Sequence, residues 1–355
     1  MTAKAEDTEK IELLCIGNAM VDVFAPADAV WLKGLGITEP AQHIPREQAE
    51  GMLDHLRDSA GNGLVFASGG AAANVAKIAS MLNTKAAFAG CAGRDDLAAF
   101  FEEELRKVGV VPFLAHGDGG TGVCFVFDSG EKTRIAGALG AAAEFTEDDL
   151  DENLIAKADA VVLDGYMLDR RPLVQRIFKM ANRHGIPIAL DAASVFQIKE
   201  KTEAILQYSR NYPLIVFMNA DESIMFYNII RKSSSADESM SERDKEAFIL
   251  REICPVLKCM TEGDIFPVIV IKLGGRGAVV LAGGNIHRAG TFTIIPRNTV
   301  GAGDAFCAAF LSAWIRGKPI RECAALGNKV AWEVLMVPGT NIEKEKLASF
   351  AKLLR

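Results

Sequence analysis

The feature that most constrains this chain of 355 residues is a repeated alternation of short apolar runs with longer amphipathic stretches. Strands this apolar need cover on both faces, and helices placed between parallel strands supply it. We therefore expect an α/β fold in which a mainly parallel central sheet lies between two helical layers. The expected strands are 11–17, 86–89, 160–163, 186–190, 214–218, 268–273 and 278–281, and the expected helices are 71–82, 96–108, 172–184, 221–231, 243–258, 302–316, 321–335 and 342–354.

Two segments depart from this alternation, at about 18–67 and 111–137. The first holds scattered glycine and proline, and the second holds runs of period two such as TGVCFVFD. A period of two predicts strands with one exposed face. We expect these segments to form a small β-sheet lid that stands off the main body and is inserted into one α/β domain of residues 11–355.

Composition argues against several classes of protein. The net charge is −7 and basic clusters such as Arg170-Arg171 are short, so we interpret them as solvated helix surface rather than as a nucleic-acid site. No apolar run reaches the roughly 18 residues of a membrane span, and the start of the chain lacks the apolar segment of a signal peptide. The seven cysteines include no CxxC pair, which favours free thiols in a reducing compartment. We expect a cytoplasmic protein.

A glycine-rich turn near the end of the chain, Gly301-Ala302-Gly303-Asp304, leads directly into an apolar helix. Small residues let the backbone approach a ligand, and the first N–H groups of the helix make an anion site suited to phosphate. A carboxylate beside a transferred phosphoryl group can accept the proton of an attacking alcohol. We expect Asp304 to be this base and the helix end to lower its pKa. Taken alone, the turn also fits an ordinary helix start with an acidic residue.

A second glycine motif, Ser68-Gly69-Gly70, precedes Asn74 on a predicted helix. The backbone can again approach a ligand here. Asn74 either binds a hydroxyl of the ligand or is an ordinary polar residue that caps or lies on the helix. Asp22 follows the first predicted strand, at the carboxyl edge where open α/β sheets bind ligands. A carboxylate at this place suits vicinal hydroxyl groups, because it can accept hydrogen bonds from both.

Together these segments resemble the PfkB carbohydrate kinase family, also called the ribokinase superfamily, over nearly the whole chain. NTVGAGDAF is similar to the C-terminal signature of that family, and SGGAAAN is similar to its N-terminal signature. The resemblance implies a ribokinase-like three-layer sandwich and an ATP-dependent kinase that phosphorylates a hydroxyl of a small molecule. It makes Asp304 the base, the N–H groups of 301–303 the anion hole, and Asp22, Gly69, Gly70 and Asn74 the substrate site.

The resemblance also implies a site for ATP and Mg²⁺. Asn219 and Glu222 match the N-x-x-E motif, which organises Mg²⁺ and phosphate partly through water, although a first-turn glutamate also suits the helix dipole alone. The other positions assigned to nucleotide or phosphates are Lys272, Gly274 and Gly277 in a strand-turn, Asn328, and the lid residue Arg134. Lys272 could instead have only a structural role at the end of its strand, and Arg134 could be an ordinary exposed residue of the lid. Asn298 replaces the first aspartate of the usual D-T-x-G-A-G-D, so activation by K⁺ is left open.

Details favour the adenosine kinase-like branch of the family. Its G-N-x-x-x-D start is similar to residues 17–22, and a later E-G-Y/F segment is similar to 164–166. The branch implies that Asn18, Met20 and Tyr166 line a pocket for a base, since an apolar wall suits a purine face. A simple sugar as acceptor and a catalytically idle ligand-binding protein remain the alternatives. We expect only ATP and a small-molecule substrate as partners, in a monomer or a homodimer.

Other motifs are rejected. Residues 117–122 match G-x-G-x-x-G, but an alternating strand follows them, whereas a dinucleotide site needs a helix there. This argues against a nicotinamide-dependent dehydrogenase. The P-loop pattern G-x-x-x-x-G-K-[ST] does not occur in the sequence.

Overall fold

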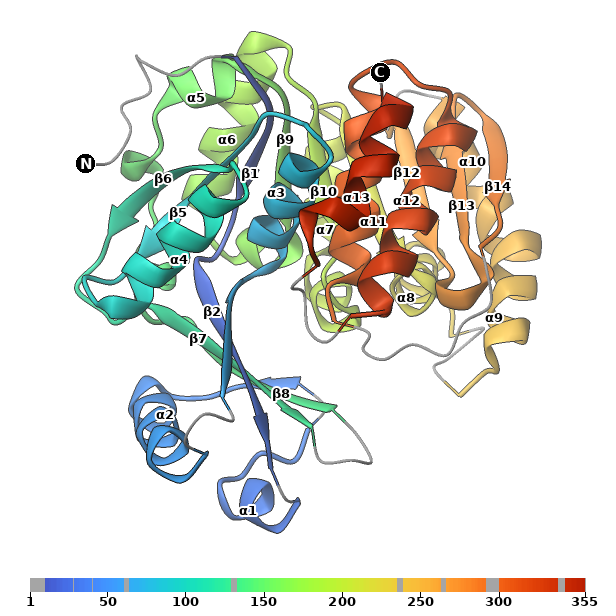
Figure 1. Ribbon diagram of the computed structural model, residues 1–355. Coiled ribbons are helices and arrows are strands. Elements are labelled where there is room, and N and C mark those ends of the chain that lie inside the picture. The colour runs from blue at the N-terminus through green and yellow to red at the C-terminus, as the bar shows by residue number, and fades with distance from the viewer. Residues whose placement is uncertain are drawn as a thin grey trace.

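The computed structural model describes residues 10–27, 29–39, 41–60, 64–128, 133–234, 239–262, 266–291, 300–337 and 342–354. Figure 1 shows a large body and a small unit, which carries α1, α2 and β8 and projects from one end of the body. The described residues form two sheets, one of nine strands and one of five.

The large sheet has the order β14-β13-β12-β11-β10-β9-β1-β5-β6 over the described strands. Neighbours from β12 to β6 pair in parallel and only β13 and β14 are antiparallel, which confirms the expected mainly parallel sheet. The order reverses at β1, the kind of point where open α/β sheets bind ligands. The strands are β1 Ile11–Ile16, β5 Ala86–Ala92, β6 Val111–His116, β9 Ala158–Asp164, β10 Ile188–Asp191, β11 Leu214–Asn219, β12 Val268–Lys272, β13 Ala278–Ala282 and β14 Asn285–Ala289.

Helices cover both faces of this sheet (Figure 1). They are α3 Ala71–Met81, α4 Asp96–Lys107, α5 Glu152–Ala156, α6 Arg171–His184, α7 Val195–Ser209, α8 Ala220–Arg231, α9 Glu242–Phe248, α10 Cys254–Glu262, α11 Ala302–Trp314, α12 Ile320–Leu335 and α13 Lys344–Ala351. Successive strand residues point to opposite faces. Leu13 and Cys15 of β1 therefore pack in one core with α3, α4 and α11 to α13, and Leu14 and Ile16 pack in a second core with α5 to α10.

The small sheet is connected to the large one at the carboxyl end of β1, where the chain continues directly into β2. Its order is β3-β8-β7-β2-β4. The strands are β2 Met20–Pro26, β3 Ala41–His43, β4 Val65–Gly69, β7 Gly122–Asp128 and β8 Thr133–Ala138, and the helices beside them are α1 Ala29–Gly34 and α2 Arg46–Ala60. Val23, Leu32, Leu53 and Phe125 share a third core, so one face of this sheet is packed against its own helices.

Residues 111–116 do not belong to the small sheet, although the alternating pattern assigned all of 111–137 to it. They form β6, which pairs in parallel with β5, with Val111 opposite Ala87. Buried and half-buried residues alternate along β6. An edge strand of the large sheet therefore has the same period as a strand of the small one, and the period alone cannot assign it to a sheet.

Several other elements differ from the sequence prediction. Helices α1 and α2 lie in the segment 18–67, which we expected to form strands of the small sheet. Helix α7 and strand β14 lie in stretches for which we predicted no regular structure. The single helix expected at 243–258 is divided into α9, a π-helical turn at Ile249–Ile253, and α10. None of the helices in the described ranges combines the length and the apolar character needed to cross a membrane.

Candidate active site

Polar side chains gather at the carboxyl ends of the parallel strands. Strand β9 ends at Asp164, β10 at Asp191, β11 at Asn219 and β12 at Lys272. In the sheet register Asp191 lies opposite Asp164, and Asn219 lies opposite Lys272. Carboxyl ends of parallel strands meet at one edge, so these groups form a polar rim on an otherwise apolar sheet.

Helix α11 begins with the predicted glycine turn. Gly301 caps it with a φ of 80°, a left-handed conformation that glycine adopts without the steric penalty of a Cβ. The first N–H groups of α11, those of Ala302, Gly303 and Asp304, have no acceptor within the helix. This geometry fits the anion site that we expected from the sequence.

A lysine lies against this turn. Lys272 Nζ is 2.5 Å from Asp191 Oδ2, and a Cβ added to Gly303 would lie 3.2 Å from the same Nζ. Burial by itself lowers the pKa of Lys272, but the carboxylates of Asp191 and Glu222 outweigh it and hold the pKa above its usual range. A permanent positive charge therefore sits beside the α11 N-terminus, where it adds to the attraction for phosphate.

Asp304 meets Asn74 although 230 residues separate them in the chain, and Asn74 Nδ2 donates to Asp304 Oδ2 at 2.9 Å. Burial raises the pKa of Asp304 to about 7, and Asp191 and Asp164 add to the rise. Our expectation of a pKa lowered by the helix end is therefore wrong, because the loss of hydration outweighs the helix. A general base with a pKa near the working pH is an effective one.

The Asn74 bond favours the ionised form of Asp304. Replacing Asn74 by Ala is therefore expected to raise the pKa of Asp304 further, and the rising limb of kcat/KM against pH should move to higher pH. Steady-state rates over the range in which carboxylates and histidines titrate measure this shift. Ser80→Ala is the control, because Ser80 lies on the same helix but donates to Val108 O. A limb that stays in place in Asn74→Ala would contradict the role of this bond.

Asp22 lies in β2 with only 5% of its surface exposed. A Cβ at Gly69 would lie 2.1 Å from Asp22 Oδ1, so the carboxylate occupies the space that any other residue at 69 would need. Gly70 has a φ of 89°, and a Cβ there would lie 2.4 Å from the Asn18 carbonyl oxygen. Both glycines of the motif are therefore required, because segment 69–70 passes close to the Asp22 carboxylate and to the Asn18 carbonyl.

A buried cation accompanies Asp22. Burial raises the pKa of Asp22 to about 6 and lowers the pKa of Lys77 to about 8, while each charge partly offsets the effect of burial on the other. Lys77 Nζ also donates to the Ser68 carbonyl. The pair lets a carboxylate exist in a nearly dry place, where its hydrogen bonds to a hydroxyl are strong.

Asn18, Met20 and Tyr166 lie around the same edge. Asn18 and Met20 are buried, and a Cβ at Gly70 would lie 3.6 Å from Met20 Cγ. The ring of Tyr166 contacts His43 of β3 edge to face, with centroids 6.4 Å apart. Tyr166 thus bridges the large body and the small sheet, and 37% of its surface remains exposed.

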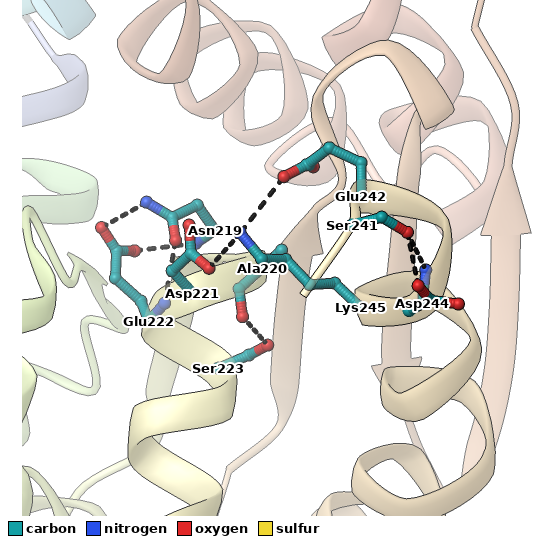
Figure 2. A network of polar contacts seen from close by, with 9 residues as sticks. All are labelled: Asn219, Ala220, Asp221, Glu222, Ser223, Ser241, Glu242, Asp244 and Lys245. Atoms are coloured by element: carbon teal, nitrogen blue, oxygen red, sulfur yellow. Dashed lines mark hydrogen bonds and ion pairs between the residues drawn. The ribbon is translucent and has the colours of Figure 1, made fainter. Parts of the chain in front are cut away.

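Asn219 and Glu222 face each other at the start of α8, as Figure 2 shows. Glu222 N–H donates to Asn219 Oδ1 at 2.8 Å, and the Glu222 carboxylate accepts from Asn219 N–H and Nδ2 at 2.7 Å each. Burial raises the pKa of Glu222 to about 7, and the negative charge of Asp191 adds to the rise. This capping box fixes the carboxylate at the polar rim, and its remaining lone pairs can accept from metal-bound water.

Known proteins are similar to this chain over most of its length. The model of the pfkB family carbohydrate kinases matches residues 47–347. The chain belongs to this family. Adenosine kinase from Dictyostelium discoideum is 25% identical, with 94% of this chain and 96% of that protein covered. For 2-dehydro-3-deoxygalactonokinase from Haloferax volcanii the identity is 24%, with 76% and 81% covered. The structure of adenosine kinase from Sinorhizobium meliloti has a TM-score of 0.80 at 25% identity and covers 98% of this chain and 100% of that one.

Two predictions are thereby confirmed for this pfkB kinase. The fold is the ribokinase-like α/β sandwich with a second small sheet. The protein is a kinase, an enzyme that transfers a phosphoryl group to an alcohol group.

Other assigned residues of the pfkB kinase have local partners. Gly277, with a φ of 89°, closes the turn after β12, and a Cβ there would lie 2.1 Å from Ala289 O. Asn328 Nδ2 donates to Ala289 O and Gly290 O at 3.1 Å each, so it holds the end of β14. Arg134 donates to Thr38 O within the small unit. Their contacts with nucleotide or phosphate stay predictions.

Gly274 has a φ of 55° and faces open space, so its backbone lies uncovered at the same turn. Asn298, on which the K⁺ question depends, lies outside the described residues.

Sequence reasoning missed four charged residues of the pfkB kinase site: Lys77, Asp164, Arg170 and Asp191. Asp164 and Asp191 end apolar strands, and that position was a usable signal for both. Lys77 looks like an ordinary helix lysine in the sequence. Arg170 was interpreted as solvated surface, but it is half-buried and donates to Asn18.

Proposed function

We propose that this enzyme transfers the γ-phosphoryl group of ATP to a hydroxyl of a nucleoside, with Asp304 as the general base. The observation that carries the proposal is the bond between Asn74 and Asp304, which joins the two glycine motifs into one site. Asn74 Oδ1 is buried and has no hydrogen-bond partner in the structure. A buried acceptor of this kind needs a donor, and a substrate hydroxyl beside Asp304 supplies one.

The residues divide the chemistry between them. Asp304 takes the proton of the hydroxyl as the new O–P bond forms, while the bond from the γ-phosphorus to the bridging oxygen breaks and ADP leaves. The N–H groups at the start of α11 and the Lys272 ammonium stabilise the negative charge on the phosphoryl group during its transfer. Asp22 accepts hydrogen bonds from ribose hydroxyls and so orients the reacting one.

The residues present fit ATP with Mg²⁺. The α11 N-terminus and Lys272 offer donors and positive charge for phosphates, and Glu222 offers oxygens for the waters of a hydrated ion. Bound there, Mg²⁺ would neutralise part of the negative charge of the phosphates. Glu222 is already fixed by its capping box, so it orients such a water without moving.

A nucleoside is favoured over a simple sugar by two residues at the substrate edge of the large sheet. Tyr166, with 37% of its surface exposed, offers an aromatic side chain that suits the face of a base, and the buried Met20 adds apolar character beside Gly70. Proteins similar to this one include adenosine kinases. A simple sugar kinase remains the second candidate, since a sugar-acid kinase is also among the similar proteins.

We place the enzyme in the cytoplasm. Its seven cysteines are all free thiols, and Cys259 is exposed. A reducing compartment keeps such thiols reduced.

The test is phosphate transfer from Mg-ATP to a panel of nucleosides and sugars, measured as ADP release and confirmed by mass of the product. We expect turnover with at least one nucleoside and none without an acceptor. Turnover confined to ribose, fructose or ketodeoxy-sugars would replace the nucleoside by a sugar. Binding of acceptors without any phosphorylation would contradict the proposal.

A further inference from the structure

Arg170 is a cation in the site that nothing in the proposed chemistry uses. It follows the 3-10 turn Gly165–Asp169, which carries Tyr166, and it stands at the N-terminus of α6. Its side chain is half-buried, and Nη2 donates to Asn18 Oδ1 at 2.5 Å. Because the Asn18 carbonyl packs against Gly70, this contact connects Arg170 with the substrate glycine motif.

The guanidinium has no direct counter-ion in the part of the chain that the structure describes, where no carboxylate oxygen lies within 4.0 Å of it. Burial lowers its pKa, and Asp164 acts in the opposite direction from a greater distance. Arginine stays charged in proteins under such conditions. A half-buried charge that no carboxylate pairs is unfavourable unless a ligand supplies an acceptor.

The contact with Arg170 also decides which way the Asn18 amide points. A guanidinium can only donate, so the amide oxygen must face it and the amide NH₂ must face elsewhere. Asn18 then offers hydrogens, as Arg170 does. Two neighbouring donor groups, with no acceptor between them, recognise a ligand edge that consists of acceptors.

We propose that Arg170 and the Asn18 amide form a donor pair that selects an acceptor substrate with two adjacent hydrogen-bond acceptors, such as O6 and N7 of a 6-oxopurine nucleoside. The inference rests on the proposed function and specifies its substrate class. Arginine binds these two purine atoms in a bidentate manner, whereas adenine presents a donor at the 6-position. The carboxylate of a sugar acid has the same acceptor chemistry.

Four proteins test the donor pair: the native enzyme, Arg170→Met, Arg170→Lys and the control Arg171→Met. Arg171 is exposed, so its replacement removes the same charge one residue away. The acceptors are inosine, guanosine, adenosine and a 2-keto-3-deoxy sugar acid, each assayed for kcat and KM. Thermal unfolding shows that each variant is folded.

We expect the native enzyme to prefer inosine or guanosine to adenosine. Arg170→Met should lower kcat/KM for the oxopurines about 10- to 100-fold, mainly through KM, and change adenosine much less. Arg170→Lys keeps one bond to Asn18 but loses the planar fork, so it should restore only part of the preference. Arg171→Met should match the native enzyme.

A preference for the sugar acid that Arg170→Met abolishes would also support the donor pair and would identify a carboxylate as its ligand. A native preference for adenosine that is unchanged in Arg170→Met would overturn the inference while leaving the proposed function intact. If the native enzyme phosphorylates neither these four nor any other nucleoside or sugar of the panel, the proposed function fails. Calorimetric binding of inosine and of the sugar acid, to native and Arg170→Met protein, then decides the inference: weaker binding to the variant supports it, and equal or undetectable binding overturns it.

Discussion

Replacing Asp304 by Asn is expected to lower kcat by about 10²- to 10⁴-fold, the range measured when a positioned general base is removed. Asparagine has nearly the same shape and can still accept the hydrogen bond from Asn74. KM should therefore change little, because the loss falls on proton transfer rather than on binding. Steady-state kinetics with a phosphorylated acceptor measure both constants.

The same substitution should make the fold more stable at neutral pH. The pKa of Asp304 is about 7 in the folded protein against an ordinary value of 3.8, so the folded state keeps a proton that the unfolded chain has released. The native enzyme therefore loses stability as pH rises from about 4 to about 7, and the Asn variant avoids this loss. The difference in Tm between the two should grow across this window.

Asp96→Asn is the matched control for both readouts. Asp96 is also an acidic residue in the first turn of a helix, but it is exposed and lies on α4. We expect its replacement to leave kcat unchanged. Near-native turnover by Asp304→Asn would exclude this residue as the base, and a constant Tm difference from pH 4 to pH 7 would show that its pKa is not raised.

Gly69→Ala is expected to reduce kcat/KM by at least about 10²-fold, since a misplaced catalytic or substrate-positioning group has effects of that size. The new Cβ would lie 2.1 Å from Oδ1 and 2.2 Å from Cγ of Asp22, so the buried carboxylate must move. Overpacking of this kind also destabilises a core by about 1–3 kcal/mol. Kinetics together with denaturant unfolding separate the two effects.

Gly137→Ala is the control within the same small sheet, because a Cβ at Gly137 would meet nothing within 4 Å. That variant should keep native kinetics and native stability. If Gly69→Ala binds the acceptor as the native enzyme does, then Asp22 does not hold the substrate.

Much of the site was predictable because many of its residues belong to short motifs of neighbouring residues. Gly69, Gly70 and Gly301 are glycines for reasons that the structure makes explicit: two of them have a positive φ, and the third lies under a carboxylate. The layering was predictable because an apolar strand has to be covered on both faces. By contrast, β6 was placed in the wrong sheet, since an edge strand and a small-sheet strand share one period.

The sequence by itself determined the three-layer fold and the two glycine motifs, because burial period and glycine geometry are properties of neighbouring residues. Only the tertiary structure decided which charges face one another. The partnership of Asp304 with Asn74 and the contact of Arg170 with Asn18 each join residues more than 150 positions apart. The pKa of Asp304 is raised by burial and by Asp191 and Asp164, which lie on other elements of the chain. Electrostatic energy depends on distance in space and on hydration, and neither can be read from the order of residues along the chain.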